Sequence, residues 1–585
     1  MCGIVGGTNP EWPYAAAVNT LRHRGPDAQK VVHPGMITLG FARLAIIDLS
    51  ESANQPMSST DGNVWVVFNG EVYGFQKVRQ NLEAAGCQFE TQSDTEVVLQ
   101  AYLTWGDKFI DRLDGMFAIG IYDRRDEKLR LYRDRPGIKP LYYFWDGNEF
   151  AFASELKAIE QLCADTSLKV DNTAIYDFLT YRYVPAPKTL YRSVCKLPPA
   201  HLLVFDVHNK CVENVSRYWE LRPDRFRNGI TTNEAGEQLR QLIEASVGEQ
   251  LVADVPVGCF LSGGMDSSVV VASAVGHRDY LKTFSIGFEI QEHSETHFAR
   301  LVADALSTDH EENIFGNEQL EALFPNLKSW YDEPFGDTSA FPTYFVSKQA
   351  RQSVTVALSG DGGDELLGGY RWYRRFRRLK RLGATVLRSK WSGPDRLRRY
   401  FADQAIPRGL CSLASLVFAE DLALYTKLMG GMTCGEKWQY ATLLEIDKHY
   451  DDYWYFREHW RTDLPPLSRL QYLDFHTYLP DDILTKVDRA SMANSLEVRV
   501  PFLSKELIEF TFSLPESILY HGGELKGLMK LAYKDVLPQE IISREKKGFS
   551  VPREYESESM GRPHERIVNE LFGFVPSDIG VASCG

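Results

Sequence analysis

The second residue of the chain is a cysteine that could act as a nucleophile. Cys2 directly follows Met1, and we expect that methionine to be removed because the side chain of Cys2 is small. The free α-amino group of an N-terminal cysteine, with a pKa of about 8, can accept the thiol proton directly or through a water. The thiolate could then attack an amide carbon. A small buried residue at the start of a strand is the alternative interpretation, and Cys2 alone leaves both open.

Other residues of the N-terminal part offer the groups that such a nucleophile needs. Asn69 and Gly70 follow an apolar strand, and the Asn69 amide with the Gly70 backbone N–H supplies two donors for a tetrahedral oxyanion. Arg43 has the planar fork that grips a carboxylate, and Asp94 could hold an ammonium group. The ordinary alternatives are a hairpin turn at the Asn-Gly pair, a surface ion pair at Arg43 and a helix N-cap at Asp94. Jointly the residues predict attack on the side-chain amide of glutamine, with release of ammonia.

Two glycine-rich stretches, each after an apolar strand, could hold a nucleotide. In the first, 262–268 (Ser-Gly-Gly-Met-Asp-Ser-Ser), the paired glycines allow backbone N–H groups and a helix N-terminus to point at a phosphate. Asp266 could hold Mg²⁺, and the lysine of a Walker A loop is absent. The second stretch, 358–370, is acidic. Since ligands bind where parallel strands end, both loops can meet over one ATP. The alternative is a plain strand-to-helix turn.

The elements that must position these groups fall into two blocks. Up to about residue 205, short apolar or alternating runs predict a sheet-rich unit with strands at 64–68, 116–122, 129–132 and 201–205 and helices at 94–105 and 173–181. A polar bridge covers 210–232. After it, alternation predicts a parallel sheet covered on both faces, with strands at 255–261, 283–288 and 354–358 and helices at 234–249, 267–275, 295–306 and 343–352. From about 405 the chain reads as mostly helical.

Composition excludes several classes of protein. The 585 residues are 44% hydrophobic and 25% charged, with a formal charge of −14, so we expect two globular domains and neither a nucleic-acid nor a membrane partner. The nine cysteines show no metal-ligand or disulfide spacing, and no signal peptide or long apolar run is present, which predicts a cytoplasmic protein. The basic run 371–400 could bind RNA, but a solvated amphipathic helix beside the nucleotide site is the favoured interpretation.

Several motifs of the N-terminal part resemble those of class II glutamine amidotransferase domains. They are the opening Met-Cys-Gly-Ile, Arg-His-Arg-Gly-Pro-Asp at 22–27, Arg43-Leu44, Asn69-Gly70-Glu71, Ser93-Asp94 and Arg-Asp-Arg at 133–135. The resemblance implies Cys2 as nucleophile, Asn69 and Gly70 as oxyanion hole, and glutamine contacts from Arg43, Leu44, Ala45, Ile46, Ile47, Asn69, Gly70, Glu71 and Asp94. One position departs from the pattern, because Gly74 replaces the usual Asn after Tyr73.

The first glycine-rich loop resembles the pyrophosphate loop of ATP pyrophosphatases, and from residue 2 to about 553 the chain is similar to glutamine-hydrolysing asparagine synthetases. Asp488-Arg489-Ala490-Ser491-Met492 and 497–503 carry part of that likeness. ATP would be a substrate and Mg²⁺ its partner, held by Asp266 and Asp364. Asp361 would serve the acyl-adenylate step and Lys526 would stabilise charge at the reacting centre. The nucleotide contacts implied are Leu261, Ser262, Gly263, Gly264, Asp266, Ser267, Ser268, Ile286, Ser359 and Gly360.

The resemblance also implies a fold and a division of the chain. We expect an α+β N-terminal-nucleophile hydrolase sandwich of αββα layers at 2–205, a linker at 206–232, an α/β parallel-sheet ATP-pyrophosphatase domain with a helical C-terminal part at 233–555, and a polar tail at 556–585. The chemistry implied is attack of the aspartate β-carboxylate on ATP, followed by attack of ammonia on the acyl-AMP to give asparagine, glutamate, AMP and pyrophosphate.

The acceptor is less well defined than the donor. The segment 332–342 lies where aspartate-using relatives place a Thr and an Arg, and it contains no Arg. Another carboxylate, on a sugar or peptide precursor, therefore stays open as the acceptor. A lactam-forming relative is a further alternative, against which the presence of Cys2 argues. A catalytically silent binding protein on the same fold is another, against which Cys2, Asn69, Asp266, Asp361, Asp364 and Lys526 together argue. The oligomeric state is open, with a homodimer among the alternatives.

Overall fold

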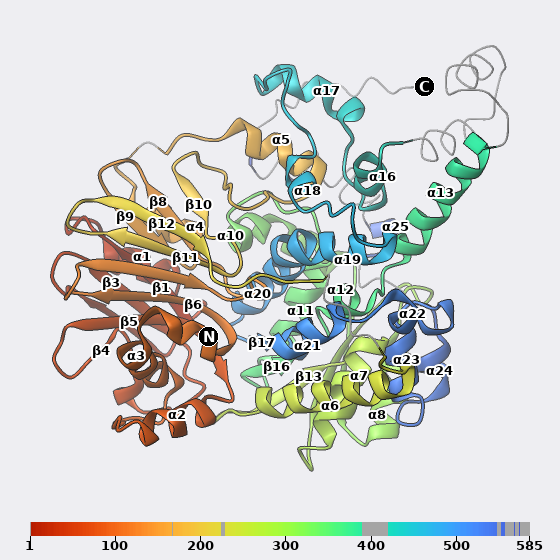
Figure 1. Ribbon diagram of the computed structural model, residues 1–585, viewed down its shortest axis with the longest axis horizontal. Coiled ribbons are helices and arrows are strands. Elements are labelled where there is room, and N and C mark those ends of the chain that lie inside the picture. The colour runs from red at the N-terminus through yellow and green to blue at the C-terminus, as the bar shows by residue number, and fades with distance from the viewer. Residues whose placement is uncertain are drawn as a thin grey trace.

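The computed structural model describes residues 2–166, 168–223, 229–388, 419–546, 551–555, 567 and 572–573. At 383–388 and 553 it describes the backbone only. A strand-rich N-terminal domain and a C-terminal domain lie side by side (Figure 1). The first strand starts at Cys2, where the two domains meet. The N-terminal part is a sandwich of two sheets and the C-terminal part is built on one parallel sheet, as predicted.

The N-terminal domain contains two six-stranded antiparallel sheets packed face to face. Apolar side chains that alternate along the strands fill the space between them, among them Ile4, Phe41, Val67 and Phe152, all at most 1% exposed. In spatial order the first sheet contains β10 (Val194–Lys196), β8 (Tyr142–Trp145), β9 (Phe150–Ala153), β1 (Cys2–Gly7), β3 (Thr38–Arg43) and β2 (Ala28–Val32). The second contains β12 (Cys211–Arg217), β11 (His201–Asp206), β7 (Lys128–Arg133), β6 (Asp114–Asp123), β5 (Val64–Tyr73) and β4 (Met57–Ser58).

Helices cover the outer faces of the sandwich, which completes the predicted αββα layers. The helices are α1 (Tyr14–Thr20) and α4 (Leu156–Leu162) against the first sheet, α2 (Phe75–Ala84) and α3 (Asp94–Trp105) beside the second, and the short turns η1 (Glu51–Ala53) and η2 (Gly106–Arg112). Helix α5 (Asn172–Tyr181) leaves the sandwich and packs against helices of the C-terminal part, where Met432 donates a backbone hydrogen bond to Leu179.

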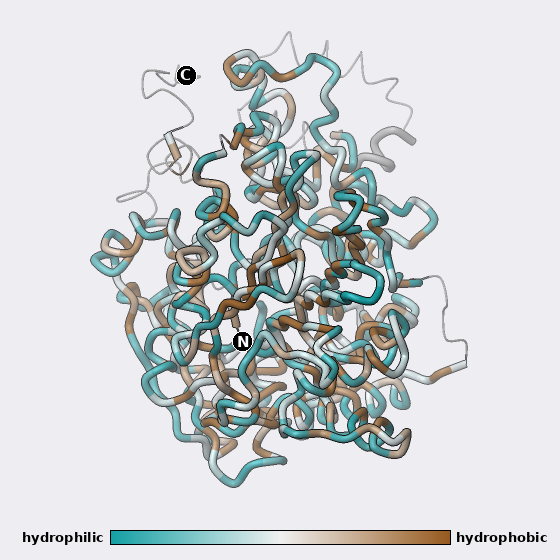
Figure 2. Tube along the Cα trace, turned by 90° about the vertical axis from the view of Figure 1, so that its left-hand side faces the viewer, coloured by the Kyte–Doolittle hydropathy of each residue, from teal (hydrophilic) through white to brown (hydrophobic). Residues whose placement is uncertain are grey.

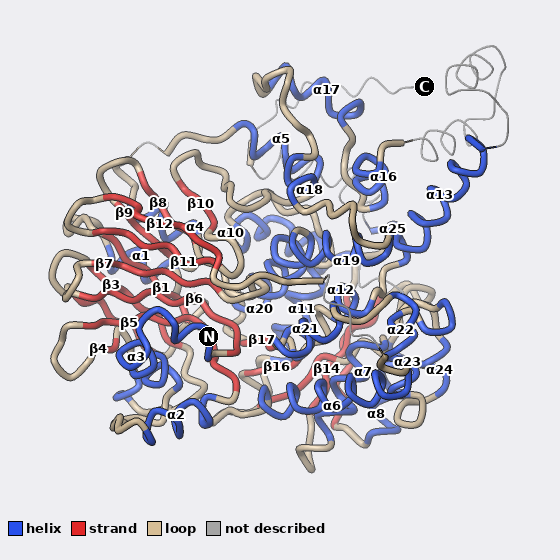
Figure 3. Tube along the Cα trace, viewed as in Figure 1, coloured by secondary structure: helices blue, strands red, loops and turns tan. Residues whose placement is uncertain are grey.

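The C-terminal domain is organised around a five-stranded parallel sheet with helices on both faces. Its strands, in spatial order, are β15 (Asp309–Phe315), β14 (Lys282–Phe288), β13 (Val257–Phe260), β16 (Val356–Leu358) and β17 (Glu497–Arg499). The helices associated with these strands are α6 (Thr232–Gln250), α7 (Met265–Val275), α8 (Thr296–Leu306), α9 (Asn317–Leu323), η3 (Phe324–Asn326), α10 (Leu327–Tyr331), α11 (Ala340–Ala350) and α12 (Gly363–Leu367). Figure 3 shows that helix dominates this half of the molecule.

The remainder of the C-terminal domain is helical, as predicted. Its elements are α13 (Arg371–Arg388), α16 (Asp421–Leu428), α17 (Cys434–Leu443), α18 (Trp454–Glu458), α19 (Pro466–His476), η4 (Leu479–Leu484), α20 (Thr485–Met492), η5 (Pro501–Leu503), α21 (Lys505–Phe512), α22 (Glu516–Leu519), η6 (His521–Gly523), α23 (Gly527–Tyr533), α24 (Gln539–Ser543) and α25 (Arg553–Tyr555). Of the predicted basic run, α13 is described and 389–400 lies outside the described residues. The predicted tail at 556–585 also lies outside them, apart from 567 and 572–573.

Four strands that differ from the sequence prediction, β5, β15, β17 and β12, show why it failed there. β5 continues past residue 68 through Asn69 and Gly70, because its partner β6 is equally long. β15 reads as polar because it is an edge strand with half-buried residues, and β17 is only three residues long. The segment 206–232, predicted as a linker, contains the exposed edge strand β12, which pairs with β11.

No helix in the described part of the chain is long and apolar enough to cross a membrane. Apolar and polar stretches are interspersed along the trace rather than gathered into one long apolar segment (Figure 2).

Candidate active sites

The predicted nucleophile lies at the start of β1. Cys2 is 7% exposed and pairs with Arg43 of β3, and its Sγ lies 4.0 Å from the carbonyl oxygen of Leu44. Burial raises the pKa of the Cys2 thiol. Since the thiolate is the nucleophile, the thiol needs a base nearby. The backbone nitrogen of Cys2, which would be that base as a free amine, donates a 2.9 Å hydrogen bond to Asn69 Oδ1.

The predicted oxyanion-hole residues lie beside this nitrogen. Asn69 and Gly70 belong to β5, opposite Ala118 and Phe117 of β6, so the hairpin-turn alternative is wrong. Because the Asn69 oxygen accepts from Cys2, its Nδ2 is the free donor, and this buried atom has no partner among the described residues. A Cβ on Gly70 would lie 2.0 Å from a carbonyl oxygen of β6, so only glycine fits there. The two donors can therefore face a developing oxyanion.

Two buried carboxyl groups line the same region. Asp94 accepts a 3.1 Å hydrogen bond from the backbone of Val72, and burial raises its pKa to about 6. Burial and the neighbouring Asp94 raise the pKa of Glu71 well above its ordinary value, although Arg499 lies 3.3 Å from Glu71. Ser93, not Asp94, caps α3, so the N-cap alternative is wrong for Asp94. The Asp94 side chain is thus free of a capping role and can serve as a partner for an ammonium group.

The predicted carboxylate clamp is held by the loop that follows it. Arg43 is 6% exposed, and its guanidinium donates to Ser50 O at 2.7 Å, to Asn54 Oδ1 at 2.9 Å and to the carbonyl oxygen of Asp48. These acceptors are neutral oxygens, so the surface-ion-pair alternative is wrong. The loop fixes the direction in which the guanidinium points. The contact of Arg43 with the carboxylate of glutamine stays a prediction.

The predicted glutamine contacts at 44–47 lie in the loop that follows β3, where the N-terminal domain contacts the C-terminal domain. Asp27 accepts a 2.8 Å hydrogen bond from the Ala45 backbone, and Ile46 accepts a 2.9 Å bond from the backbone of Asp254 in the C-terminal part. Leu44, Ile46 and Ile47 are buried. The loop next to Cys2 is therefore tied to the other domain.

The two glycine-rich loops of the C-terminal domain come together, as predicted. Gly263 has a φ of +67°, and a Cβ there would lie 2.5 Å from the backbone of Ala299, so the turn requires glycine. The Ser267 hydroxyl accepts a 3.1 Å hydrogen bond from the Ser262 backbone and closes the loop. A Cβ on Gly360 would lie 2.7 Å from the Ser267 backbone nitrogen. Glycine at both positions thus allows the backbones to pack in direct contact.

Carboxylates and lysines converge beside these loops. Lys526 Nζ lies 2.5 Å from Asp266 Oδ2 and 2.5 Å from Asp364 Oδ1, and Lys546 also pairs with Asp364. Burial alone would raise the pKa of Asp364, but Lys526 and Lys546 lower it to about 2. Burial raises the pKa of Asp266 in spite of Lys526. Asp361 accepts a 2.5 Å hydrogen bond from Ser359 at the edge of the same group.

Most of the predicted nucleotide contacts share one cavity of about 1330 Å³. The members that line it are Leu261, Ser262, Gly264, Asp266, Ser267, Ile286, Ser359, Gly360, Asp361, Asp364 and Lys526. Gly263 and Ser268 do not line it, because Gly263 packs on α8 and Ser268 is fully buried. The chemistry of the lining, with glycine-rich backbone, the three aspartates Asp266, Asp361 and Asp364, and lysines, suits a nucleotide with its metal.

Sequence reasoning missed several charged residues of this cavity. Arg182, Lys486, Arg544 and Lys546 all line it, although they come from separate parts of the chain. Arg544 donates a 2.8 Å hydrogen bond to the Gly263 carbonyl oxygen. Lys546 follows 20 residues after Lys526 in a basic stretch, a signal that could have found it. Arg182 and Lys486 had no comparable sequence signal.

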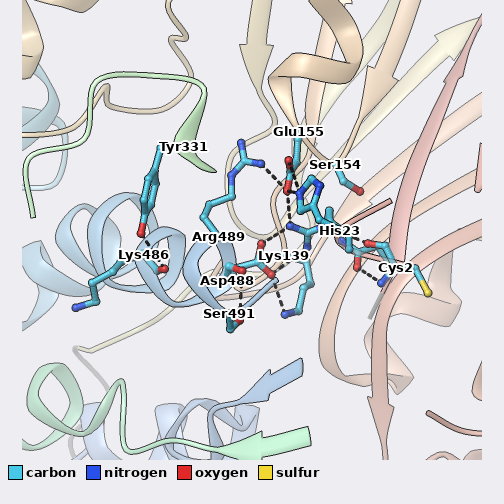
Figure 4. A network of polar contacts seen from close by, with 12 residues as sticks. Cys2, His23, Lys139, Ser154, Glu155, Tyr331, Lys486, Asp488, Arg489 and Ser491 are labelled. Carbon is cyan, nitrogen blue, oxygen red and sulfur yellow. Dashed lines mark hydrogen bonds and ion pairs between the residues drawn. The ribbon is translucent and has the colours of Figure 1, made fainter. Parts of the chain in front are cut away.

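A buried ionic network joins the two sites. Arg24 donates to the Cys2 carbonyl oxygen at 3.2 Å and pairs with Glu155 and Asp488 at 2.8 Å each. Arg489, next to Asp488 on α20, lies 2.7 Å from Glu155. Figure 4 shows that Asp488 and Arg489 point towards the Cys2 side, while Lys486 of the same helix points away from it. Helix α20 thus contacts both the glutaminase side and the nucleotide cavity.

Comparisons with known proteins agree with this two-site architecture. The family model described as asparagine synthase matches residues 238–572, and the glutamine amidotransferase domain matches residues 1–219. Asparagine synthetase [glutamine-hydrolyzing] 1 of Bacillus subtilis is 34% identical over 580 residues, which cover 94% of this chain and 87% of that protein. A putative asparagine synthetase [glutamine-hydrolyzing] of Mycobacterium bovis is 32% identical, with 94% and 88% covered. The amidase chry2 of Gibberella zeae is 28% identical, with 95% and 87% covered.

The fold and the two sites define an ATP-using ligase with a glutamine amidotransferase domain. The chain belongs to the glutamine-hydrolysing asparagine synthetase family.

Proposed function

We propose that the protein makes asparagine from aspartate, glutamine and ATP. At the first site the Cys2 thiolate would attack the glutamine amide carbon, ammonia would leave, and water would release glutamate from the thioester. At the second site an oxygen of the aspartate β-carboxylate would attack the α-phosphorus of ATP, giving β-aspartyl-AMP and pyrophosphate. Ammonia would then displace AMP and give asparagine.

The glutaminase half of the proposal is supported by the contacts of Cys2. Its nitrogen is held 2.9 Å from Asn69 Oδ1, which leaves Asn69 Nδ2 as a buried donor next to the thiol. Asn69 and the Gly70 backbone N–H would stabilise the oxyanion, because donors aimed at developing charge act mainly in the transition state. We assign Asp94 and Glu71 to the glutamine α-ammonium group and Arg43 to its α-carboxylate.

Magnesium is proposed as the partner of ATP, held by Asp266 and Asp364. The residues fit this metal, since Mg²⁺ takes one or two carboxylates and completes its shell with phosphate oxygens and waters. Asp266 Oδ1 is buried and has no hydrogen-bond partner among the described residues. Among the described residues, no three His, Cys, Asp or Glu side chains are grouped so that they could hold a metal ion by themselves. When bound, the metal would screen the phosphate charges.

The protein's own groups would act around the reacting carboxylate. Lys526 would offset the charge that develops on the α-phosphate, and Lys546 would support the phosphates from the other side of Asp364. Asp361 stands at the edge of this group and is assigned to the acyl-adenylate step. A cytoplasmic setting is also proposed, since the described cysteines are unpaired.

One observation carries the proposal: Lys526 Nζ bridges Asp266 and Asp364 at 2.5 Å each, although these residues lie up to 260 positions apart. The test is exchange of labelled pyrophosphate into ATP, measured with the whole protein, Mg²⁺ and each acceptor in the absence of glutamine. We expect exchange that depends on aspartate, with AMP and pyrophosphate as the products once ammonium is added. Formation of ADP and phosphate, or exchange that ignores aspartate, would contradict the proposal.

A further inference from the structure

A second group of charged side chains lies in the wall of the nucleotide cavity. It consists of Arg182, Asp337 and Lys486, which come from the end of α5, the loop before α11 and the start of α20. All three line the same cavity as the glycine-rich loops. Asp337 belongs to the segment 332–342, which contains no Arg. The structure brings two cations to that segment from elsewhere in the chain.

Contacts hold the group together. Lys486 Nζ lies 3.2 Å from Asp337 Oδ2, and the guanidinium of Arg182 donates to the carbonyl oxygen of Gly336. The Gly336 backbone in turn donates a 2.8 Å hydrogen bond to the Arg182 carbonyl oxygen. The charges also affect one another. Burial alone would raise the pKa of Asp337, but Lys486 and Arg182 hold it well below its ordinary value.

Unused hydrogen-bonding capacity remains in this group. The Nε–H of Arg182 is buried and has no hydrogen-bond partner among the described residues. An unpaired buried polar atom is costly, and such atoms concentrate where a ligand binds.

The group lies beside the reacting centre. Lys486 interacts electrostatically with Asp361 as well as with Asp337, so it lies near both the loop that contains Asp361 and the loop that contains Asp337. Contacts of Tyr331 also hold the loop that contains Asp337 in place. Tyr331 and Phe335 stack with ring centroids 4.2 Å apart, and the Tyr331 hydroxyl donates to the Lys486 carbonyl oxygen at 3.2 Å. A ligand held here would therefore meet fixed charges next to the loop of Asp361.

We propose that this group is the recognition site for the amino-acid end of the acceptor, with Asp337 binding its α-ammonium group and Arg182 and Lys486 binding its α-carboxylate. The proposal rests on the proposed function and deepens it, because it requires an acceptor that is a free α-amino acid. One anion and two cations side by side match a zwitterion, and a planar guanidinium suits a carboxylate. The acceptor site would then be completed by Arg182, a residue that the N-terminal half of the chain contributes.

The first test uses the unmodified protein and three acceptors in aspartate-dependent pyrophosphate exchange. Succinate lacks the ammonium group of aspartate, and 3-aminopropanoate lacks its α-carboxylate. Each analogue removes one charged contact, and a charged hydrogen bond contributes enough for a loss of roughly 10–100-fold in kcat/KM. Exchange with succinate or 3-aminopropanoate at the rate of aspartate would overturn the inference without needing any variant.

The second test uses the substitutions Arg182→Gln, Lys486→Gln and Asp337→Asn. We expect each to raise the KM for aspartate roughly 10–100-fold while the KM for ATP and the glutaminase rate change little. Asp337→Asn should also reduce the preference for aspartate over succinate. Arg182→Lys should recover part of the loss. Lys348→Gln is the matched control, since it removes a charge from the exposed face of α11.

The outcomes separate the inference from the proposed function. If the unmodified protein shows no exchange with aspartate, the proposed function fails and the inference with it. If it exchanges with aspartate but Arg182→Gln and Lys486→Gln leave the KM for aspartate unchanged, the inference alone fails. An equal loss with ATP and aspartate would indicate a structural role for these residues and would also overturn it.

Discussion

The two sites of this protein are built in opposite ways. The glutaminase site lies on paired strands, where β1, β3 and β5 fix Cys2, Arg43 and Asn69 by the register of the sheets. The synthetase site is a cavity of about 1330 Å³ whose lining comes from loops and helix ends up to 260 residues apart. In the first site hydrogen bonds of the backbone hold the geometry. In the second, ion pairs between the catalytic candidates themselves hold it.

This difference predicts how the sites respond to substitution. A strand-borne site should lose its chemistry when its nucleophile is changed and keep its geometry, because the backbone pairs are unaffected. A site held by its own charges should be sensitive at every charged member, since each member also positions the others.

The first prediction concerns Cys2→Ala. We expect glutamine-dependent synthesis to fall below detection, because the thiolate forms the bond to the amide carbon, while ammonium salts still support synthesis at the second site. Product formation with glutamine and with ammonium chloride is the measurement. Cys163→Ala, a change at another buried free cysteine of the same domain, is the control. Glutaminase activity that survives in Cys2→Ala would remove Cys2 from its role.

The second prediction concerns Lys526→Ala. The rate of aspartate-dependent pyrophosphate exchange should fall on the order of 10²–10³-fold, as is typical for loss of an electrostatic partner of the transition state. The KM for ATP should change little, because Lys546 still pairs with Asp364. Asp266→Ala or Asp364→Ala should instead weaken the use of Mg-ATP with any acceptor. Near wild-type exchange in Lys526→Ala would show that this lysine is not part of the chemistry.

The third prediction uses the carboxyl pair of the glutaminase site. Asp94, with a pKa of about 6, is charged above that pH and neutral below it, so its hold on an ammonium group is lost as the pH falls. The kcat/KM for glutamine should therefore decline about tenfold per pH unit below pH 6. Asp94→Asn should lower kcat/KM at neutral pH and remove this inflection. An unchanged pH profile in Asp94→Asn would assign the inflection to another group.

The smallest effect is expected at Gly74. Its φ of +62° suits asparagine as well as glycine, and a Cβ there would lie 3.1 Å from Glu249 Oε1, the end of a flexible side chain. Gly74→Asn should therefore preserve glutamine hydrolysis within about threefold of the original rate. Gly74→Val, which is strained at this φ, should reduce it. A large loss in Gly74→Asn would mean that this loop departs from the family geometry.

Much of the fold could be predicted because local pattern and global structure agree. The helix predicted at 94–105 has the same bounds as α3, and the strands at 283–288 and 354–358 overlap β14 and β16. The prediction failed where context decides. The strand predicted at 64–68 ends too early, since Asn69 and Gly70 stay in β5 because β6 pairs with them along its whole length. β17 has only three residues, and the neighbouring strand β16 makes it part of the sheet.

The site could be predicted in part for a related reason. Some site residues belong to short contiguous motifs whose residue types alone indicate their chemistry. These are Cys2, Asn69, Asp266 and Asp364. Arg182 and Lys486 were not found, because their roles depend on contacts with Gly336 and Asp337 about 150 residues away. Only the folded chain shows that such isolated cations share a cavity with the nucleotide loops.

If the two sites work together as proposed, nitrogen released at Cys2 reaches a carboxylate that is activated beside Lys526. The most direct test supplies glutamine labelled with ¹⁵N in its side-chain amide, together with aspartate and Mg-ATP, and follows the label by mass spectrometry. We expect asparagine that carries ¹⁵N in its amide, with one AMP and one pyrophosphate formed for each asparagine. Glutamate formed without labelled asparagine, or ADP in place of AMP, would contradict this expectation.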